Sequence, residues 1–277
     1  SLREMTTMFF RNYAAVAGLI LLITILLFVF VGPLIHTTDP FEMVWAPFTM
    51  PMQEGFILGT DYLGRDILSA MMAGGQVSLA IGLAAALVSV IIGVSVGAFA
   101  GYYGGLVEEL LMRFTEFFQV LPTLLFSMVI VALFGASLLT VTLAIGVVSW
   151  TAVARVTRSE FLRIREMEYV AAARSGSARD LYLIFKVILP NALPPIVVQA
   201  NLMEGSAILF EAALSFLGLS DPNVMSWGQV IGSNRPYILD AGFAVAIPGF
   251  AIFLTVLAIS LVGDGLNDAL NPKLRQR

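Results

Sequence analysis

The sequence contains long apolar stretches without a single charged residue. The first runs from Ala14 to Leu34, and two longer ones cover Ile67–Val107 and Phe117–Ala154. An α-helix needs about 20 apolar residues to cross the ~30 Å hydrocarbon core of a bilayer. The whole chain is 58% apolar and 12% charged, whereas soluble domains carry about 25% charged residues. We therefore expect lipid to surround most of the chain.

The pattern predicts an all-α integral membrane protein with six transmembrane helices. The expected spans are Ala14–Leu34, about Val77–Ala100, two helices within Phe117–Ala154 divided at Gly135–Ser137, about Pro195–Leu217 and about Phe243–Val262. Residues 1–57 are expected to form an N-terminal helix and the start of an extracytoplasmic loop. Residues 58–277 are expected to form the main transmembrane domain.

The basic residues indicate the orientation. With six spans, both termini lie on one side, and that side holds 13 of the 15 Lys and Arg residues. They are Arg3, Arg11, Arg113, Arg155, Arg158, Arg163, Arg165, Arg174, Arg179, Lys186, Lys273, Arg275 and Arg277. Only Arg65 and Arg235 fall on the other side. Because cytoplasmic loops are enriched in Lys and Arg, this distribution predicts cytoplasmic termini.

The composition excludes several kinds of site. The chain has no cysteine, and its one histidine, His36, follows the first apolar run, so neither a Cys-ligated metal nor a His-based triad is expected. A phosphate-binding P-loop needs a lysine followed by Ser or Thr, but Lys186 and Lys273 precede Val187 and Leu274. We therefore expect no cofactor in this chain and no ATP hydrolysis by it. No array of basic and aromatic residues suggests nucleic acid.

Four glycines at intervals of four, Gly93, Gly97, Gly101 and Gly105, mark the second expected span. This spacing leaves one helix face without side chains, so that another helix backbone can approach closely. Packing within the subunit and packing against another subunit both fit the pattern.

Two carboxylates, Glu204 and Glu211, lie two helical turns apart on one face of the fifth expected span. Intramembrane carboxylates are costly and usually face a bundle interior or a wet cavity. They fit a lining of a pathway or gate. They equally fit a hydrated position for Glu211 near the outer interface and a buried polar partner for Glu204.

The loop at residues 155–191 is the only expected cytoplasmic segment long enough to fold outside the membrane. Its pattern predicts helices at Thr157–Ser175 and Ala178–Ile188, separated at Gly176–Ser177 and closed by Pro190, Pro194 and Pro195. The second helix would present Leu181, Ile184, Phe185 and Ile188 as one apolar stripe. The small residues Ala171, Ala172 and Ala173 leave room for a partner protein, and Glu168 and Arg174 lie close enough to pair with it. The loop therefore predicts a docking site.

Several motifs of the chain resemble a known family. The segments Glu168–Ala173 and Ile188–Asn191 resemble the EAA loop of ABC importer permeases. Three further segments are similar to the shorter, "C"-type permease of the dipeptide/oligopeptide branch: Leu58–Asp61 with Gly64–Asp66, Glu211–Leu219 with Ser226–Gly228, and Gly263–Leu266 with Asp268–Pro272. Glu211 fits the family pattern and Glu204 does not. Ser177 stands where the family has glycine, with Gly176 one place earlier, which suggests a shifted turn.

The resemblance implies a permease of the bacterial inner membrane. Its partners would be a longer homologous permease, two cytoplasmic ATPases that bind ATP and Mg, and an extracytoplasmic substrate-binding protein. The site that couples the permease to the ATPases would comprise Glu168, Ala171, Ala172, Ala173, Arg174, Gly176 and Ser177. The solute would be a short peptide or a related small solute.

A proton-coupled secondary transporter that uses Glu204 or Glu211 is the alternative. It would act alone and would not need a docking loop.

Overall fold

The computed structural model describes residues 2–270, and all its regular elements are helical. Lys273, Arg275 and Arg277 of the charge count, and Asn271–Pro272 of the last motif, lie outside the described residues. The longer helices are α1 (Leu2–Arg11), α2 (Tyr13–Ile35), α3 (Ile67–Tyr103), α4 (Gly105–Val120), α5 (Thr123–Phe134), α6 (Leu138–Ser149), α7 (Thr151–Arg165), α8 (Glu168–Ser175), α10 (Leu189–Phe216), α11 (Trp227–Asn234) and α12 (Phe243–Leu270). Shorter elements are α9 (Asp180–Tyr182), the π-helical segment Leu183–Ile188 and the 3₁₀ turn Arg235–Tyr237.

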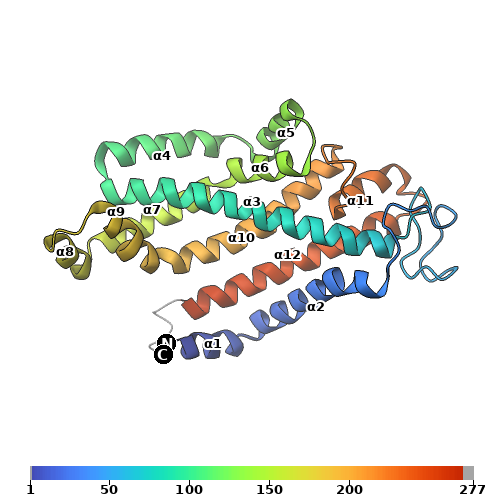
Figure 1. Ribbon diagram of the computed structural model, residues 1–277, viewed down its shortest axis with the longest axis horizontal. Helices are drawn as coiled ribbons and strands as arrows, with labels where there is room; N and C mark the ends of the chain where they lie inside the picture. Colours follow the sequence, from blue (N-terminus) through green and yellow to red (C-terminus); the bar gives the residue numbers. More distant parts are fainter. Residues whose placement is uncertain (1, 271–277) are drawn as a thin grey trace.

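The long helices α2, α3, α10 and α12 run roughly along the long axis of the molecule and alternate in direction (Figure 1). Helix α8, α1 and the last turns of α12 lie at one end. The loop of residues 36–66 and α11 lie at the opposite end. The chain therefore crosses between the two ends repeatedly, as the predicted spans require.

Four continuous helices are long and apolar enough to span a bilayer: α2, α3, Asp180–Phe216 and α12. Two bent pairs qualify if each pair counts as one span, namely α4 with α5, bent by 85°, and α6 with α7, bent by 41°. The all-helical membrane fold with up to six passes is thus confirmed. The predicted break at residues 135–137 is also confirmed, because Ser137 caps α6 and its hydroxyl accepts the Thr140 N–H.

The prediction of a third span that begins near Phe117 was wrong. Instead, α4 begins at Gly105, and the bend falls between Val120 and Thr123. Pro122 accounts for it, because proline disfavours helical dihedrals in the residue before it. Leu121 accordingly has an extended ψ of 127°.

Three of the four spaced glycines pack α3 against α7 of the same subunit. A Cβ at Gly93 would lie 2.6 Å from the Val153 side chain, and one at Gly97 would lie 2.3 Å from the Ala154 carbonyl. One at Gly101 would lie 2.6 Å from Phe161. The interpretation as packing within one subunit is therefore correct for these three. Gly105 instead begins α4 at a positive φ of 54°.

The fifth pass starts well before Pro195, where the sequence predicted it to start. It is continuous from Asp180 to Phe216 and includes the prolines that were expected to end the cytoplasmic helix. Packing explains the continuation. The fully buried side chains of Ile184, Ile188 and Ala192 follow one another every four residues in one core cluster. This apolar face favours a continuous helix despite the hydrogen bonds that the prolines cannot donate.

Candidate functional site

Helix α8 is a short surface helix at one end of the molecule (Figure 1). Its only fully buried side chain is Val170, which lies in a core cluster with Ile164, Leu183 and Ile184. The burial of Val170 fixes α8 to the bundle, while most of the helix surface stays accessible.

The predicted single helix Thr157–Ser175 is divided in the structure. Helix α7 ends at Arg165, and Met167 has an extended ψ of 145° before α8 begins. This break lets α8 turn Val170 into the core. Of the predicted apolar stripe in the next helix, Ile184 and Ile188 are buried in the core, whereas Leu181 and Phe185 are exposed.

The alanine surface of α8 is open. Ala171 and Ala172 are exposed, and Ala173 is partly buried against the same core cluster. Glu168 is exposed and forms no hydrogen bond or ion pair with any residue in the range 2–270. The surface can thus receive side chains of another protein without first breaking a contact of its own.

Arg174, in contrast, already has contacts within the subunit. Its guanidinium lies 5.9 Å from the ring centre of Tyr102. The Tyr102 hydroxyl donates a 2.7 Å hydrogen bond to Asp180. Arg174 therefore helps to position the start of the fifth pass next to the end of α3.

Ser177 takes the left-handed backbone conformation in the turn after α8. Its φ is 62°, whereas Gly176 has a φ of −76°. The Ser177 N–H donates to the Arg174 carbonyl and the Ala178 N–H to the Ala173 carbonyl, which is the hydrogen-bond pattern of a Schellman motif. The suggested shift of the turn towards Gly176 is therefore wrong, and the serine adopts the conformation that favours glycine.

Two arginines of this region have positioning roles that the sequence did not reveal. Arg165 donates to the carbonyls of Gly101 and Tyr102 at 3.0 and 3.3 Å, and so caps the C-terminal end of α3. Arg158 forms an ion pair with Glu108, with an Nε–Oε1 distance of 2.7 Å. In the sequence they are simply part of the basic charge of the loop.

Glu211 lies at the centre of a buried polar network. Its side chain accepts hydrogen bonds from Ser215 at 2.8 Å and Ser226 at 2.6 Å, and from Ser78 at 3.4 Å. Only 2% of Glu211 is exposed. The residues belong to α3, α10 and the cap of α11, so the carboxylate joins three elements.

The segment Ser226–Gly228 packs directly on this network. Trp227 donates its backbone N–H to the Ser78 hydroxyl and its indole N–H to the Met71 carbonyl. A Cβ at Gly228 would lie 2.7 Å from Ala212 and 3.1 Å from Glu211. The segment Ser226–Gly228 thus packs on α3 and α10 and forms one closed structure with them at the end of the molecule opposite α8 (Figure 1).

Glu204 has a different environment. It is partly buried, and its carboxylate forms no hydrogen bond or ion pair within the described chain. The buried polar partner that one interpretation of the sequence required is therefore not among residues 2–270.

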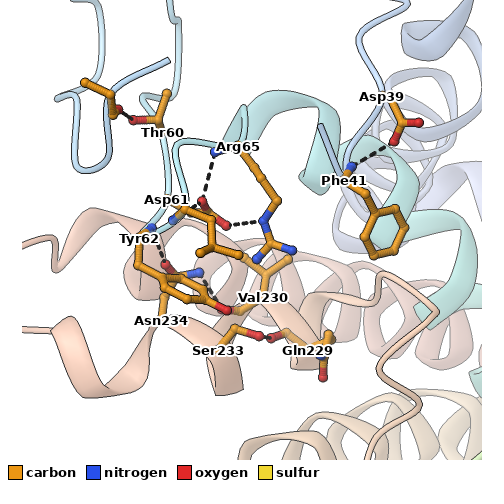
Figure 2. A network of polar contacts seen from close by, with 12 residues as sticks. Asp39, Phe41, Thr60, Asp61, Tyr62, Arg65, Gln229, Val230, Ser233 and Asn234 are labelled. Atoms are coloured by element: carbon orange, nitrogen blue, oxygen red, sulfur yellow. Dashed lines mark hydrogen bonds and ion pairs between the residues drawn. The ribbon is translucent and has the colours of Figure 1, made fainter. Parts of the chain in front are cut away.

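The loop before α3 has its own polar framework. Figure 2 shows Asp61 bonded to Arg65, with an Oδ2–Nε distance of 2.6 Å and a bond from the Arg65 N–H. Asn234 of α11 accepts the Tyr62 N–H, and the Tyr62 ring stacks on Tyr237. The loop motif and the segment at α11 are thus held together as one surface at this end of the molecule.

His36 contacts Asp66 at 2.6 Å, and Asp66 caps the start of α3 by accepting the Ser69 N–H. This pair joins the end of α2 to the start of α3. Among residues 2–270, no group of three or more His, Cys, Asp or Glu residues could hold a metal ion.

Two family models match the sequence. One describes a binding-protein-dependent transport system inner membrane component and covers residues 89–276. The other describes the N-terminal TM domain of oligopeptide transport permease C and covers residues 2–51.

Curated relatives match nearly the whole chain. The dipeptide transport system permease protein DppC of Escherichia coli K12 is 42% identical, with 99% of this chain and 94% of the relative covered. The di/tripeptide transport system permease protein DppC of Pseudomonas aeruginosa is 40% identical, with 99% and 93% covered. The oligopeptide transport system permease protein OppC of Escherichia coli K12 is 38% identical, with 96% and 89% covered.

Among solved structures, a chain of the MetNI methionine ABC transporter in an inward-facing conformation is similar in fold. The TM-score is 0.60 at 19% identity, and the match covers 73% of this chain and 96% of that chain.

Proposed function

Because this chain belongs to the family of inner membrane components of binding-protein-dependent transport systems, we propose that it forms half of the pore of an importer for short peptides. As a member of this family it is a multi-pass permease subunit of an ABC transporter, not an enzyme. Its relatives give no support to the alternative of a self-contained secondary transporter.

One observation carries the coupling part of the proposal. The accessible surface of α8 is followed, after a single turn, by one helix that runs from Asp180 to Phe216. That helix also carries Glu211, in the closed network at the opposite end. A protein that displaces α8 therefore acts on an element that reaches the extracytoplasmic end.

In the proposed cycle, α8 binds in a groove of a cytoplasmic ATPase, and a second ATPase holds the partner permease. ATP and Mg are bound by these ATPases. ATP binding draws the two coupling helices together, closes the cytoplasmic side and opens the pore towards the binding protein, and hydrolysis resets it. The open alanine surface and Glu168 support this assignment, because Ala171, Ala172 and Glu168 are exposed and the Glu168 side chain has no hydrogen bond or ion pair within the described residues.

The proposed partner permease is a longer homologous chain, which gives a heterodimer. Both termini are proposed to be cytoplasmic, because α1 and the end of α12 lie at the same end as the basic α8 region (Figure 1). Residues 1–57 and 58–277 are proposed as the N-terminal and main parts of the subunit. The surface built from the loop of residues 36–66 and α11 would then face the binding protein.

A short peptide is proposed as the solute, because relatives along the full length are named for dipeptide, di/tripeptide and oligopeptide transport.

The coupling assignment is tested by adding bulk to the alanine surface. Ala172→Trp should detach the ATPases or uncouple ATP hydrolysis from uptake in the reconstituted transporter. Ala172→Ser is the matched control and should behave as wild type. Glu168→Gln should weaken coupling only partly, because an exposed ion pair contributes roughly 1 kcal/mol or less.

A cysteine at position 172 should also cross-link to one in the ATPase groove, with a yield that changes with nucleotide. The assignment fails if Ala172→Trp leaves assembly and uptake intact and no position from 168 to 177 cross-links to an ATPase.

A further inference from the structure

One face of α10 changes steadily in exposure along its length. Leu193, Val197, Glu204 and Glu211 are spaced by four, seven and seven residues, so they lie on the same side of an α-helix. Leu193 and Val197 are 44% and 41% exposed, Glu204 is partly buried and Glu211 is 2% exposed. The face is therefore open near the α8 end and closed at the Glu211 network.

This face differs from the other exposed side of α10. Leu202 and Leu209 are 42% and 48% exposed, and at about 100° per residue they lie roughly 140–160° around the helix from Glu204. Glu204 is thus not part of that apolar surface. A carboxylate within a membrane span is costly in lipid and is expected to face water or a charged partner.

The position of Glu204 is fixed by its neighbours. Its backbone carbonyl packs close to Gly82 of α3, where an added Cβ would be only 3.3 Å away. Asn201, one turn earlier, donates a 2.7 Å hydrogen bond to the Ile259 carbonyl of α12. The backbone of α10 around Glu204 is therefore held against both α3 and α12.

We propose that this face of α10 lines the solute pathway, and that Glu204 binds the protonated amino group of the passing solute. The inference rests on the proposed importer function and adds a specificity-determining residue to it. Every unmodified peptide has an amino terminus that is largely protonated near pH 7. A carboxylate and an ammonium group form a charge-assisted hydrogen bond, which is stronger than one between neutral groups.

The pathway part is tested in the complete transporter without nucleotide. The chain has no native cysteine, so Glu204→Cys introduces the one thiol of this subunit, whose labelling is read on the isolated subunit band, and Leu202→Cys provides the matched control on the opposite face. A membrane-impermeant, charged methanethiosulfonate reagent supplied from the cytoplasmic side should label position 204 and leave position 202 unlabelled. An unreactive thiol at position 204, or equal labelling at both positions, would overturn the assignment of this face to the pathway.

The amine-binding part is tested by the charge that labelling installs. In the Glu204→Cys transporter, a sulfonatoethyl group on the introduced thiol should restore ATP-driven uptake of dialanine, whereas a trimethylammonioethyl group should not. Glu204→Gln should lower kcat/KM for dialanine about tenfold, and Glu204→Asp should retain most of it. Equal uptake after both modifications would overturn amine binding.

Failure of the proposed function has a separate signature. A wild-type transporter that does not accumulate dialanine or longer peptides would refute the peptide importer. The extent of thiol labelling in the Glu204→Cys variant, compared with that in the Leu202→Cys variant, would still decide whether this face of α10 is exposed to water.

Discussion

Replacement of Glu211 by leucine is expected to destabilise the subunit strongly. The change removes the acceptor for the hydroxyls of Ser226 and Ser215, and the weaker one for Ser78. A buried donor without a partner costs about 1–3 kcal/mol. The Ser215 hydroxyl can turn to a backbone carbonyl one helical turn earlier, which relieves one of the three. The net loss is therefore roughly 2–5 kcal/mol.

Replacement of Glu211 by glutamine is expected to cost much less. The amide keeps one oxygen that can accept from Ser215 and Ser226, which both bond to the same carboxylate oxygen. Its NH₂ group can donate to the Ser78 hydroxyl, which lies beside the other oxygen. The Ser78 hydroxyl must then turn its own hydrogen to a backbone carbonyl one helical turn earlier, and with that change we expect a loss of about 1 kcal/mol or less.

The two variants are compared by the thermal unfolding midpoint of the purified transporter and by uptake in liposomes. A kcal/mol corresponds to a shift of roughly 2–4 °C for a chain of this size, so a loss of roughly 2–5 kcal/mol in Glu211→Leu should lower Tm by about 4–20 °C. Ser206→Ala, which removes a hydroxyl bonded only to its own helix, is the control and should change little. A Glu211→Gln transporter that assembles with normal Tm but takes up no solute would refute a packing role and indicate a pathway or gate.

Two further predictions concern topology and the α8 turn. Single cysteines at positions 54 and 165 should differ in intact cells, where an impermeant thiol reagent labels position 54 and not position 165; the reverse pattern would contradict cytoplasmic termini. Ser177→Gly should raise the Tm of the assembled transporter, because a φ of 62° costs an L-residue roughly 1–2 kcal/mol. The greater freedom of glycine in the unfolded chain offsets part of that gain. A lower Tm would show that the serine side chain stabilises the turn.

The sequence predicted the elements whose physical cause is local. The charge-free run Ala14–Leu34 became α2 almost to the residue, since only a helix can satisfy its backbone within lipid. The glycine spacing predicted a close helix approach, and α7 provides it at Gly97. Two of the three small side chains of α8, Ala171 and Ala172, are exposed as expected, and Ala173 is partly buried.

The sequence failed where tertiary contacts outweigh local preferences. Pro190, Pro194 and Pro195 predicted the end of a helix, but the buried face that includes Ile188 and Ala192 keeps the helix continuous. The break between α7 and α8 depends on the burial of Val170, which no local pattern reveals. The hydroxyl partners of Glu211 come from residues as distant as Ser78, so their convergence could not be read from spacing.

The continuous helix from Asp180 to Phe216 connects the two parts of the site. Its first residue accepts a hydrogen bond from Tyr102 at the end of α3, and near its far end Glu211 accepts one from the cap of α11. Between them lies the π-helical segment Leu183–Ile188, whose wider turns are uncommon and often mark functional sites. A force applied at α8 would therefore reach the Glu211 network through one element with one irregular segment. We expect that segment to absorb the change of angle, because the Glu211 network and the close contact at Gly82 hold the rest of the helix against α3.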